Sequence, residues 1–175
     1  MKTINITIKK DEVLNNISMN IYTIGERITD GDAKAVFVVQ SGVDEGNRSL
    51  VIRELNNSWQ NVLNMLAAYR TKRDRAIGPI KPKPEDVSNS YSNELTENDY
   101  QMTLYFPDNI PDDTGANMVE AIHSYMVSMG CFLWLKMARP DEAKIYFSEA
   151  EDSSKRIKSI SCNRTRPTRI VGYGF

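Results

Sequence analysis

The segment from Tyr125 to Met137 constrains the fold of this chain more than any other. It reads YMVSMGCFLWLKM, and only Ser128 and Lys136 are clearly polar. A helix that is apolar almost all round needs cover on every side, so it belongs at the centre of a bundle or in a subunit interface. We therefore expect this helix to be the best-buried element, with Phe132 and Leu133 as core residues.

Three further segments carry apolar residues at helical spacing. One follows Asp11, one runs from about Ser49 to Ile77, and one begins at Pro140, a favoured first-turn residue. The apolar helix is expected to run from Asp113 or Thr114 to about Ala138. Its short junction with the segment at Pro140 makes these two helices an antiparallel pair. The inward line of the last helix is expected to comprise Ala143, Phe147, Ala150, Ser154, Ile157 and Ser161.

Two other segments, Thr3–Ile8 and Tyr100–Phe106, alternate between apolar and polar residues, as half-buried strands do. Isolated strands with open edges are costly, so we expect the two to pair with each other or with a neighbouring subunit. The Ala33–Val43 segment is ambiguous, because its apolar run suits either a short strand or a buried helical turn.

The expected fold class is therefore mainly α: a helical bundle of about four helices with a small two-stranded β element and an extended C-terminal arm. Residues 1–162 are expected to form a single helical domain, within which residues 78–99 form a loop rich in Pro, Ser and Asn. Residues 163–175 form the arm, since a helix does not continue through Pro167.

Charge is nearly balanced in total but unevenly placed. The chain has 22 Lys and Arg against 23 Asp and Glu, for a net charge of −1. Basic residues gather in Arg70–Lys83 and Lys155–Arg169, whereas residues 84–135 contain no Lys or Arg. This pattern fits either ordinary solvated surface or a molecule that stacks on copies or partners of opposite local charge.

The arm is basic first and then apolar and aromatic, which a purely solvated tail rarely needs. It folds back on its own domain or docks on a neighbouring chain as an added strand or extended arm, and we favour the neighbour. The acidic 84–135 stretch of that neighbour offers carboxylates for its arginines. The expected partner-binding residues are Arg164, Arg166, Arg169, Ile170, Val171, Tyr173 and Phe175.

Few residues of this chain are of the types that catalysis or metal binding requires. One histidine and two cysteines exclude a two-histidine mechanism, a disulfide scaffold and a four-thiolate zinc site. We interpret His123 as a hydrogen-bonded core or interface residue, Cys131 as a core thiol and Cys162 as partly exposed. The sequence contains neither a phosphate-binding loop nor a dinucleotide fingerprint.

Two carboxylate clusters have structural explanations. Asp112-Asp113 is expected to cap a helix, and Glu149 with Glu151 and Asp152 to form a solvated face, an oxygen-ligand metal site being the alternative. We therefore expect no catalytic residues, no cofactor and no metal, and a protein that is not an enzyme.

No segment resembles a signal peptide or a membrane span, so we expect a protein made in a cytoplasm.

The order of features along the chain carries a resemblance. A strand runs straight into a helix over Thr3–Val13, and Tyr22–Arg27, Asn57–Trp59 and Tyr100–Pro107 follow. Trp134, the Glu142–Tyr146 helix start and a basic helix end with an Arg-Pro tail complete the pattern. This layout resembles small structural proteins of Bacteroidales phages and prophages: head–tail connector or neck ring proteins, including those of crAss-like phages.

The resemblance implies a virion component of the neck or tail, assembled in the bacterial host cytoplasm. Such proteins form rings, often twelvefold, that join the portal to the tail and other neck proteins. They surround the channel through which genomic DNA passes without sequence-specific binding. The alternative is a nucleic-acid-binding protein that uses Arg70–Lys83 and the Arg-rich tail. A small regulatory or toxin-like protein is a third, weaker alternative.

Overall fold

The computed structural model describes residues 1–27, 45–70 and 99–165. Ala33–Val43, most of the 78–99 loop and residues 166–175 lie outside these described residues, so the predictions made for them stay predictions. The described elements are β1 (Lys2–Ile8), α1 (Lys10–Arg27), α3 (Glu45–Met65), α4 (Ala67–Arg70), β2 (Tyr100–Phe106), α5 (Thr114–Ala138) and α6 (Pro140–Cys162).

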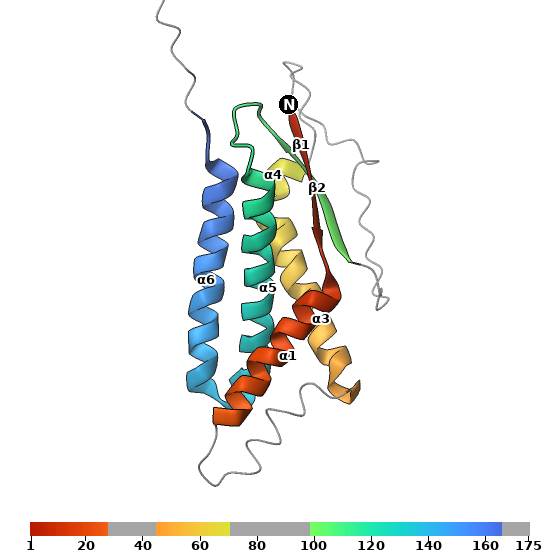
Figure 1. The fold of residues 1–175 in the computed structure, drawn as a ribbon, viewed down its shortest axis with the longest axis vertical. Helices are drawn as coiled ribbons and strands as arrows, with labels where there is room; N and C mark the ends of the chain where they lie inside the picture. The colour runs from red at the N-terminus through yellow and green to blue at the C-terminus, as the bar shows by residue number, and fades with distance from the viewer. Residues whose placement is uncertain (28–44, 71–98, 166–175) are drawn as a thin grey trace, which may run out of the picture.

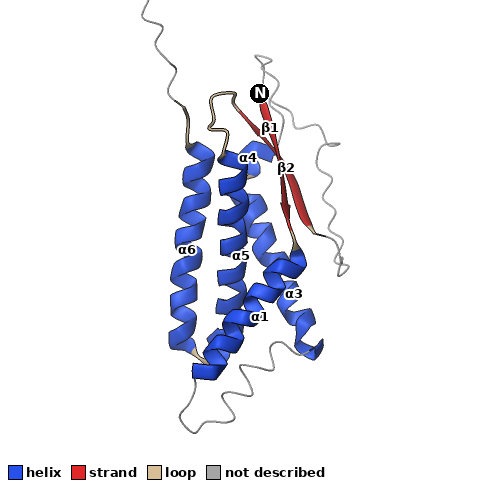
Figure 2. Ribbon diagram, viewed as in Figure 1, coloured by secondary structure: helices blue, strands red, loops and turns tan. Residues whose placement is uncertain are grey.

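The described helices form a bundle around α5 (Figures 1 and 2). α6 lies antiparallel beside α5, while α1 and α3 contact its other sides. β1 and β2 form an antiparallel two-stranded sheet, with α4 against β2 and the start of α5 close to β1. The predicted fold class, a mainly helical bundle with a small two-stranded β element, is confirmed.

The sheet buries one face because its apolar residues alternate in register. Ile6 lies opposite Met102 and Ile4 opposite Leu104, and the side chains of Ile6 and Leu104 are almost fully buried. The alternate residues of β1, namely Thr3, Asn5 and Thr7, point to the outer face and are exposed. The predicted pairing of the two alternating segments is therefore confirmed.

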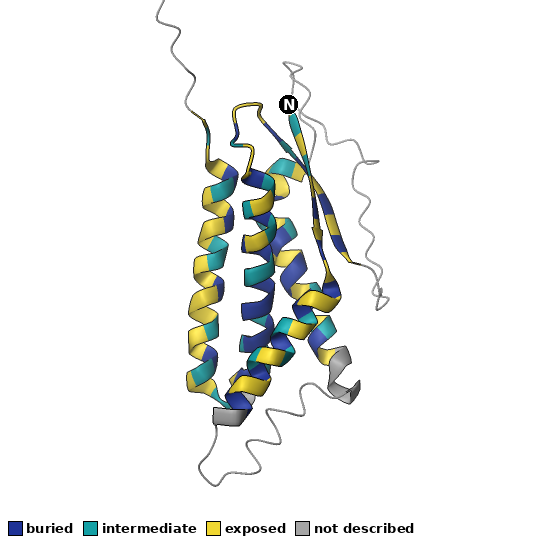
Figure 3. Ribbon diagram, viewed as in Figure 1, coloured by how far each residue is buried: buried dark blue, intermediate teal, exposed yellow. Residues whose placement is uncertain are grey.

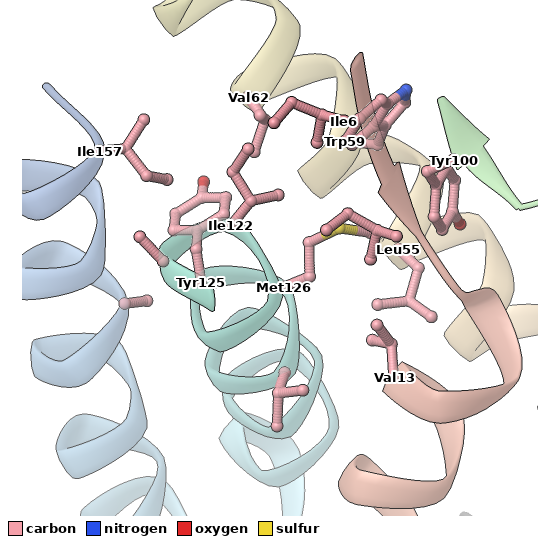
Figure 4. Packing of buried hydrophobic residues seen from close by; sticks show 14 of the residues in the cluster. Ile6, Val13, Leu55, Trp59, Val62, Tyr100, Ile122, Tyr125, Met126 and Ile157 are labelled. Atoms are coloured by element: carbon pink, nitrogen blue, oxygen red, sulfur yellow. The ribbon is translucent and has the colours of Figure 1, made fainter. Parts of the chain in front are cut away.

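α5 supplies much of the core, as its composition predicts. Ile122 and Met126 have no exposed surface, and Tyr125 points towards Ile157 of α6 (Figure 4). Figure 3 shows that burial concentrates on α5 and on the sides of the other elements that face it. Phe132 and Leu133, expected as core residues, are half-buried, because their side of α5 is incompletely covered; Phe132 packs against the edge of the buried core.

By length and composition alone, Thr114–Lys136 of α5 satisfies the requirement for a helix that crosses a membrane. An 18-residue window of this span is 56% buried inside the protein. The core helix of a bundle has the same length and composition, and contacts with α1, α3, α6 and β1 place α5 in that role.

The helix expected from about Ser49 to Ile77 is present as α3 and α4, which are separated by an interruption at Leu66; residues 71–77 lie outside the described residues. The N–H of Tyr69 donates to the carbonyl of Leu66 at 2.9 Å, a tighter turn than an α-helix makes. The turn buries Leu66 completely and stacks Tyr69 on Phe106 of β2, with ring centroids 4.7 Å apart. Burial against the sheet therefore outweighs a regular helix at this point.

α6 is amphipathic, and only its narrow inner stripe is buried. Ala143, Ala150, Ile157 and Ser161 are buried as predicted. Phe147 is wrongly predicted to face inward: its side chain is 43% exposed and leans sideways onto Phe132, with ring centroids 5.0 Å apart. The small residues of the stripe let α6 approach α5 closely, which leaves Phe147 at the edge of the contact.

The loop between β2 and α5, residues 107–113, forms hydrogen bonds with both β1 and the residues that follow α6. Asp112 accepts a hydrogen bond from Lys2 Nζ at 2.7 Å, and the Lys2 ammonium holds the pKa of that carboxyl below its usual range. Asp113 occupies the N-cap position of α5 without a side-chain capping bond. The predicted capping by the Asp112-Asp113 pair is therefore wrong, because Asp112 pairs with β1 instead.

Two methionines on α5 offer a matched test of this core. Met126 has no exposed surface, whereas Met129, one turn later, is half-buried. Met126→Ala should lower the free energy of unfolding by roughly 2–5 kcal/mol, since a buried cavity results. Met129→Ala should cost clearly less, as measured by urea denaturation. Equal costs would contradict the described position of α5.

Gly130 marks a close approach of α1 and α3 to α5. A Cβ there would fall inside van der Waals contact with Ile17 Cδ1, and would lie 3.1 Å from Ile17 Cγ1 and 3.7 Å from Leu55 Cδ2. Gly130→Ala should therefore cost up to about 2 kcal/mol, because overpacking of roughly 1–3 kcal/mol is offset by a gain in helix propensity of about 1 kcal/mol.

A double-mutant cycle isolates that contact. In the Ile17→Val background the terminal methyl is gone, so Gly130→Ala should become neutral or stabilising in the same denaturation measurement. Strictly additive effects of the two substitutions would show that a Cβ at position 130 does not contact the Ile17 side chain.

Candidate functional site

A groove of about 540 Å³ lies between α1 and α6, with α5 between them. We call it the α1–α6 groove. It forms because α1 and α6 both pack on α5 but diverge from each other along it (Figure 1). Its lining residues are Asn16, Met19 and Asn20 of α1, His123, Ser124, Val127 and Ser128 of α5, and Glu149 and Ser153 of α6.

Helical spacing explains why the lining is polar. Asn16 and Asn20 are four residues apart on α1, as are Ser124 and Ser128 on α5, so each pair shares one helix face. Glu149 and Ser153 repeat the spacing on α6. Three polar helix stripes therefore face one channel, although α5 is apolar on its other sides.

Long polar contacts cross the groove between helices. Asn16 Nδ2 lies 3.4 Å from His123 Nε2, and Ser128 Oγ donates to Glu149 Oε2 at 3.4 Å. Asn20 Nδ2 lies 3.8 Å from Cys131 Sγ. These distances are at the weak end of the hydrogen-bonding range, so the groove side chains keep donor and acceptor capacity for a bound group.

Cys131 lies below the groove and is buried, as predicted. Burial raises the pKa of its thiol to about 12, against the lowering effect of the nearby Asn20 amide, and the Glu149 carboxylate adds to the rise. A thiol with so high a pKa is protonated at neutral pH and is a poor nucleophile.

The chemical groups in the groove are those of polar side chains spaced along three helices. His123 and Ser124 are adjacent on one helix and therefore do not face each other. In the described parts of the chain, no three His, Cys, Asp or Glu side chains are grouped so that they could hold a metal ion. What the groove offers is amide, hydroxyl and carboxylate groups spaced along a channel, with Met19 and Val127 as apolar contacts.

No protein-family model, curated protein or solved structure matches this chain. The resemblance to phage neck ring proteins therefore stays a prediction, and function has to be argued from the surfaces of the molecule.

Of the predicted partner-binding residues, the structure describes Arg164. Its Nη1 donates to the carbonyls of Ser161 and Asn163 at 2.8 and 2.7 Å, which satisfies the end of α6. The next residue, Thr165, donates its N–H and its Oγ1 to the carbonyl of Asn109 at 2.8 and 2.9 Å. The other predicted residues, Arg166, Arg169, Ile170, Val171, Tyr173 and Phe175, lie outside the described residues.

Exposed apolar side chains lie on three helices, namely α1, α6 and, with Leu50, α3. On α1, Met19 is 68% and Tyr22 53% exposed; on α6, Ile145 is 56% exposed and Phe147 is the other exposed apolar residue. Met19 also lines the α1–α6 groove. Single exposed apolar residues are normal on a protein surface, so these side chains are candidate contact points and not a contiguous apolar patch.

Where the structure describes the acidic stretch, its carboxylates have ion-pair or hydrogen-bond partners within the subunit. Asp99 accepts from the N–H of Lys10, Glu120 pairs with Arg156 at 3.0 Å, and Asp108 pairs with the N-terminus. Asp112 pairs with Lys2, and Asp113 accepts from Asn117. Of the basic 70–83 segment, only Arg70 is described, and it is exposed.

Sequence reasoning singled out His123 and Glu149 but missed the groove that joins them. The available signal was the four-residue spacing of Ser124 and Ser128 within an otherwise apolar helix. The Asn16 and Asn20 pair gives the same signal on α1. Nothing in the sequence states that these helices lie side by side, so the shared channel needed the fold.

The two thiols should differ strongly in reactivity. Cys162 is exposed, whereas the raised pKa of Cys131 lowers its thiolate fraction at pH 8 about a thousandfold relative to a thiol of pKa 9. Ellman's reagent should therefore modify one thiol quickly and the other at least a hundredfold more slowly. Cys162→Ser should abolish the fast phase, and denaturant should equalise the rates.

A fast reaction that persists in the Cys162→Ser variant would contradict the described burial of Cys131.

The raised pKa of Cys131 also makes the stability of the fold depend on pH, in a definite direction. Because the folded thiol holds its proton more tightly, its contribution to folding is full below about pH 9 and is lost as pH rises towards 12.

Proposed function

We propose that this chain is a non-catalytic structural protein that assembles into a ring, in the role of a head–tail connector of a phage neck. In that role copies surround the DNA channel between portal and tail, and DNA passes without sequence-specific binding. The layout of the sequence supports this role, and so does a surface built for contacts with other chains.

The observation that carries the proposal is the incomplete cover of α6. This helix spans 23 residues, yet four of them are buried and two large apolar residues, Ile145 and Phe147, are exposed. A helix of this length that contacts mainly one neighbour leaves most of its surface available to another chain. α1 presents a different exposed apolar pair, Met19 and Tyr22.

Exposed apolar residues on two different helices of one subunit suit a ring. When a patch of one copy contacts a different patch of the next, the contact is head-to-tail, and it closes into a ring if the rotation between copies divides the circle. The bundle is elongated (Figure 1), so residues on its different helices are available to different neighbouring copies. Repetition around the ring turns weak individual contacts into a stable assembly.

The proposal predicts assembly that depends on the exposed apolar residues of α6. Light scattering after size exclusion, with and without a portal protein, should show a symmetric particle of many copies. Ile145→Asp should reduce the assembled mass while the circular dichroism spectrum of the helices is unchanged. Ser148→Asp adds the same charge at an exposed position of the same helix, and should have little effect.

A chain that stays monomeric at all concentrations, alone and with the portal protein, would contradict the proposal. DNA affinity whose logarithm falls linearly with the logarithm of the salt concentration would instead support the nucleic-acid-binding alternative.

A further inference from the structure

We propose that the α1–α6 groove of one copy binds residues 166–175 of a neighbouring copy, with an arginine of that segment paired with Glu149. This inference rests on the proposed ring assembly, and it identifies the surface that the C-terminal arm occupies. The partner is thus a second copy of this chain.

Charge complementarity points to this pairing. Glu149 is the one charged residue that lines the groove, and no ion pair involves it among the described residues. Residues 166–175 carry Arg166 and Arg169 and no acidic residue. A guanidinium can bind a carboxylate with two parallel hydrogen bonds, which fixes the geometry of the pair.

The acidic stretch that the sequence suggested as the docking surface is a poorer acceptor. The side chains of Asp108, Asp112 and Glu120 already form ion pairs inside the subunit. An incoming arginine would have to displace Lys2, Arg156 or the N-terminus from them. In the groove, the contact to displace is the 3.4 Å hydrogen bond from Ser128 to Glu149.

The lining also suits an extended chain. Amide and hydroxyl side chains on all three helices can donate to peptide carbonyls and accept from peptide N–H groups. A volume of about 540 Å³ is that of a pocket for a short stretch of chain rather than for a whole helix. The exposed Met19 lies in the lining, where Tyr173 or Phe175 can contact it.

The position of Thr165 favours a neighbouring copy over the same chain. Thr165 is held at the carbonyl of Asn109, beyond the end of α6, whereas Glu149 lies 13 residues before Cys162. At a rise of about 1.5 Å per residue, the chain would have to turn back at once and run about 20 Å along α6. Pro167 favours extended backbone at Arg166, which opposes that reversal. Ten extended residues reach roughly 33 Å outward.

Disulfide trapping in the full-length chain tests the inference. Cys162→Ser removes the exposed thiol, and Ser153→Cys in the groove is combined with Gly172→Cys in the arm. Mild oxidation should link chains into a ladder of multimers on a non-reducing gel. Ser148→Cys, on an exposed part of α6 outside the lining residues, replaces Ser153→Cys in the matched control and should give little ladder.

Glu149→Gln in the trapping variant should lower the cross-linked fraction about two- to fivefold, as expected for an ion pair at an exposed carboxylate. Glu151→Gln, which changes an exposed carboxylate of α6 outside the lining, should leave that fraction unchanged. Equal effects of the two substitutions would overturn the assignment of Glu149.

Light scattering on the same samples separates the two proposals. Rings that form without a ladder would overturn the groove inference and leave the proposed function standing. A disulfide within single chains would also overturn it, because the arm would then occupy its own groove. Monomers without any cross-link would overturn both.

Discussion

The burial of α5 is the constraint on which the rest of this structure depends. A 25-residue helix with apolar residues on nearly every side is stable only when other elements cover it. α1, α3, α6 and the start of the sheet each cover one part. Their cover is incomplete in two regions: the polar α1–α6 groove and the half-buried side at Phe132 and Leu133.

Small residues and tight turns determine how closely these elements approach. Gly130 brings Ile17 and Leu55 against the backbone of α5, and the alanine and serine stripe of α6 does the same on the other side. The interruption at Leu66 is the corresponding adjustment at the sheet, since it lets Tyr69 stack on Phe106. Local irregularity is accepted wherever it buries more apolar surface.

Periodicity predicted both strands, their pairing and the limits of α5 and α6, because these features follow from which residues alternate or recur along the chain. It failed for the helix break at Leu66 and for Phe147, where the decisive contacts come from residues distant in sequence. For the same reason, the sequence contained every lining residue of the groove but not the groove. The spacing of Asn16 and Asn20 identifies a polar stripe, and only the crossing of α1 over α5 places it opposite Ser128 and Glu149.

Charge pairing inside the subunit explains how an almost neutral chain can still favour one mode of association. The loop before α5 is tied to β1 through Lys2 and Asp112, and Glu120 of α5 is paired with Arg156 of α6. With these carboxylates satisfied internally, the arginines beyond Thr165 have no acidic residue in their own segment to pair with. In the assembly proposed above, the arginines of residues 166–175 pair with Glu149 of a neighbouring copy, and a contact between two different surfaces repeats in one direction.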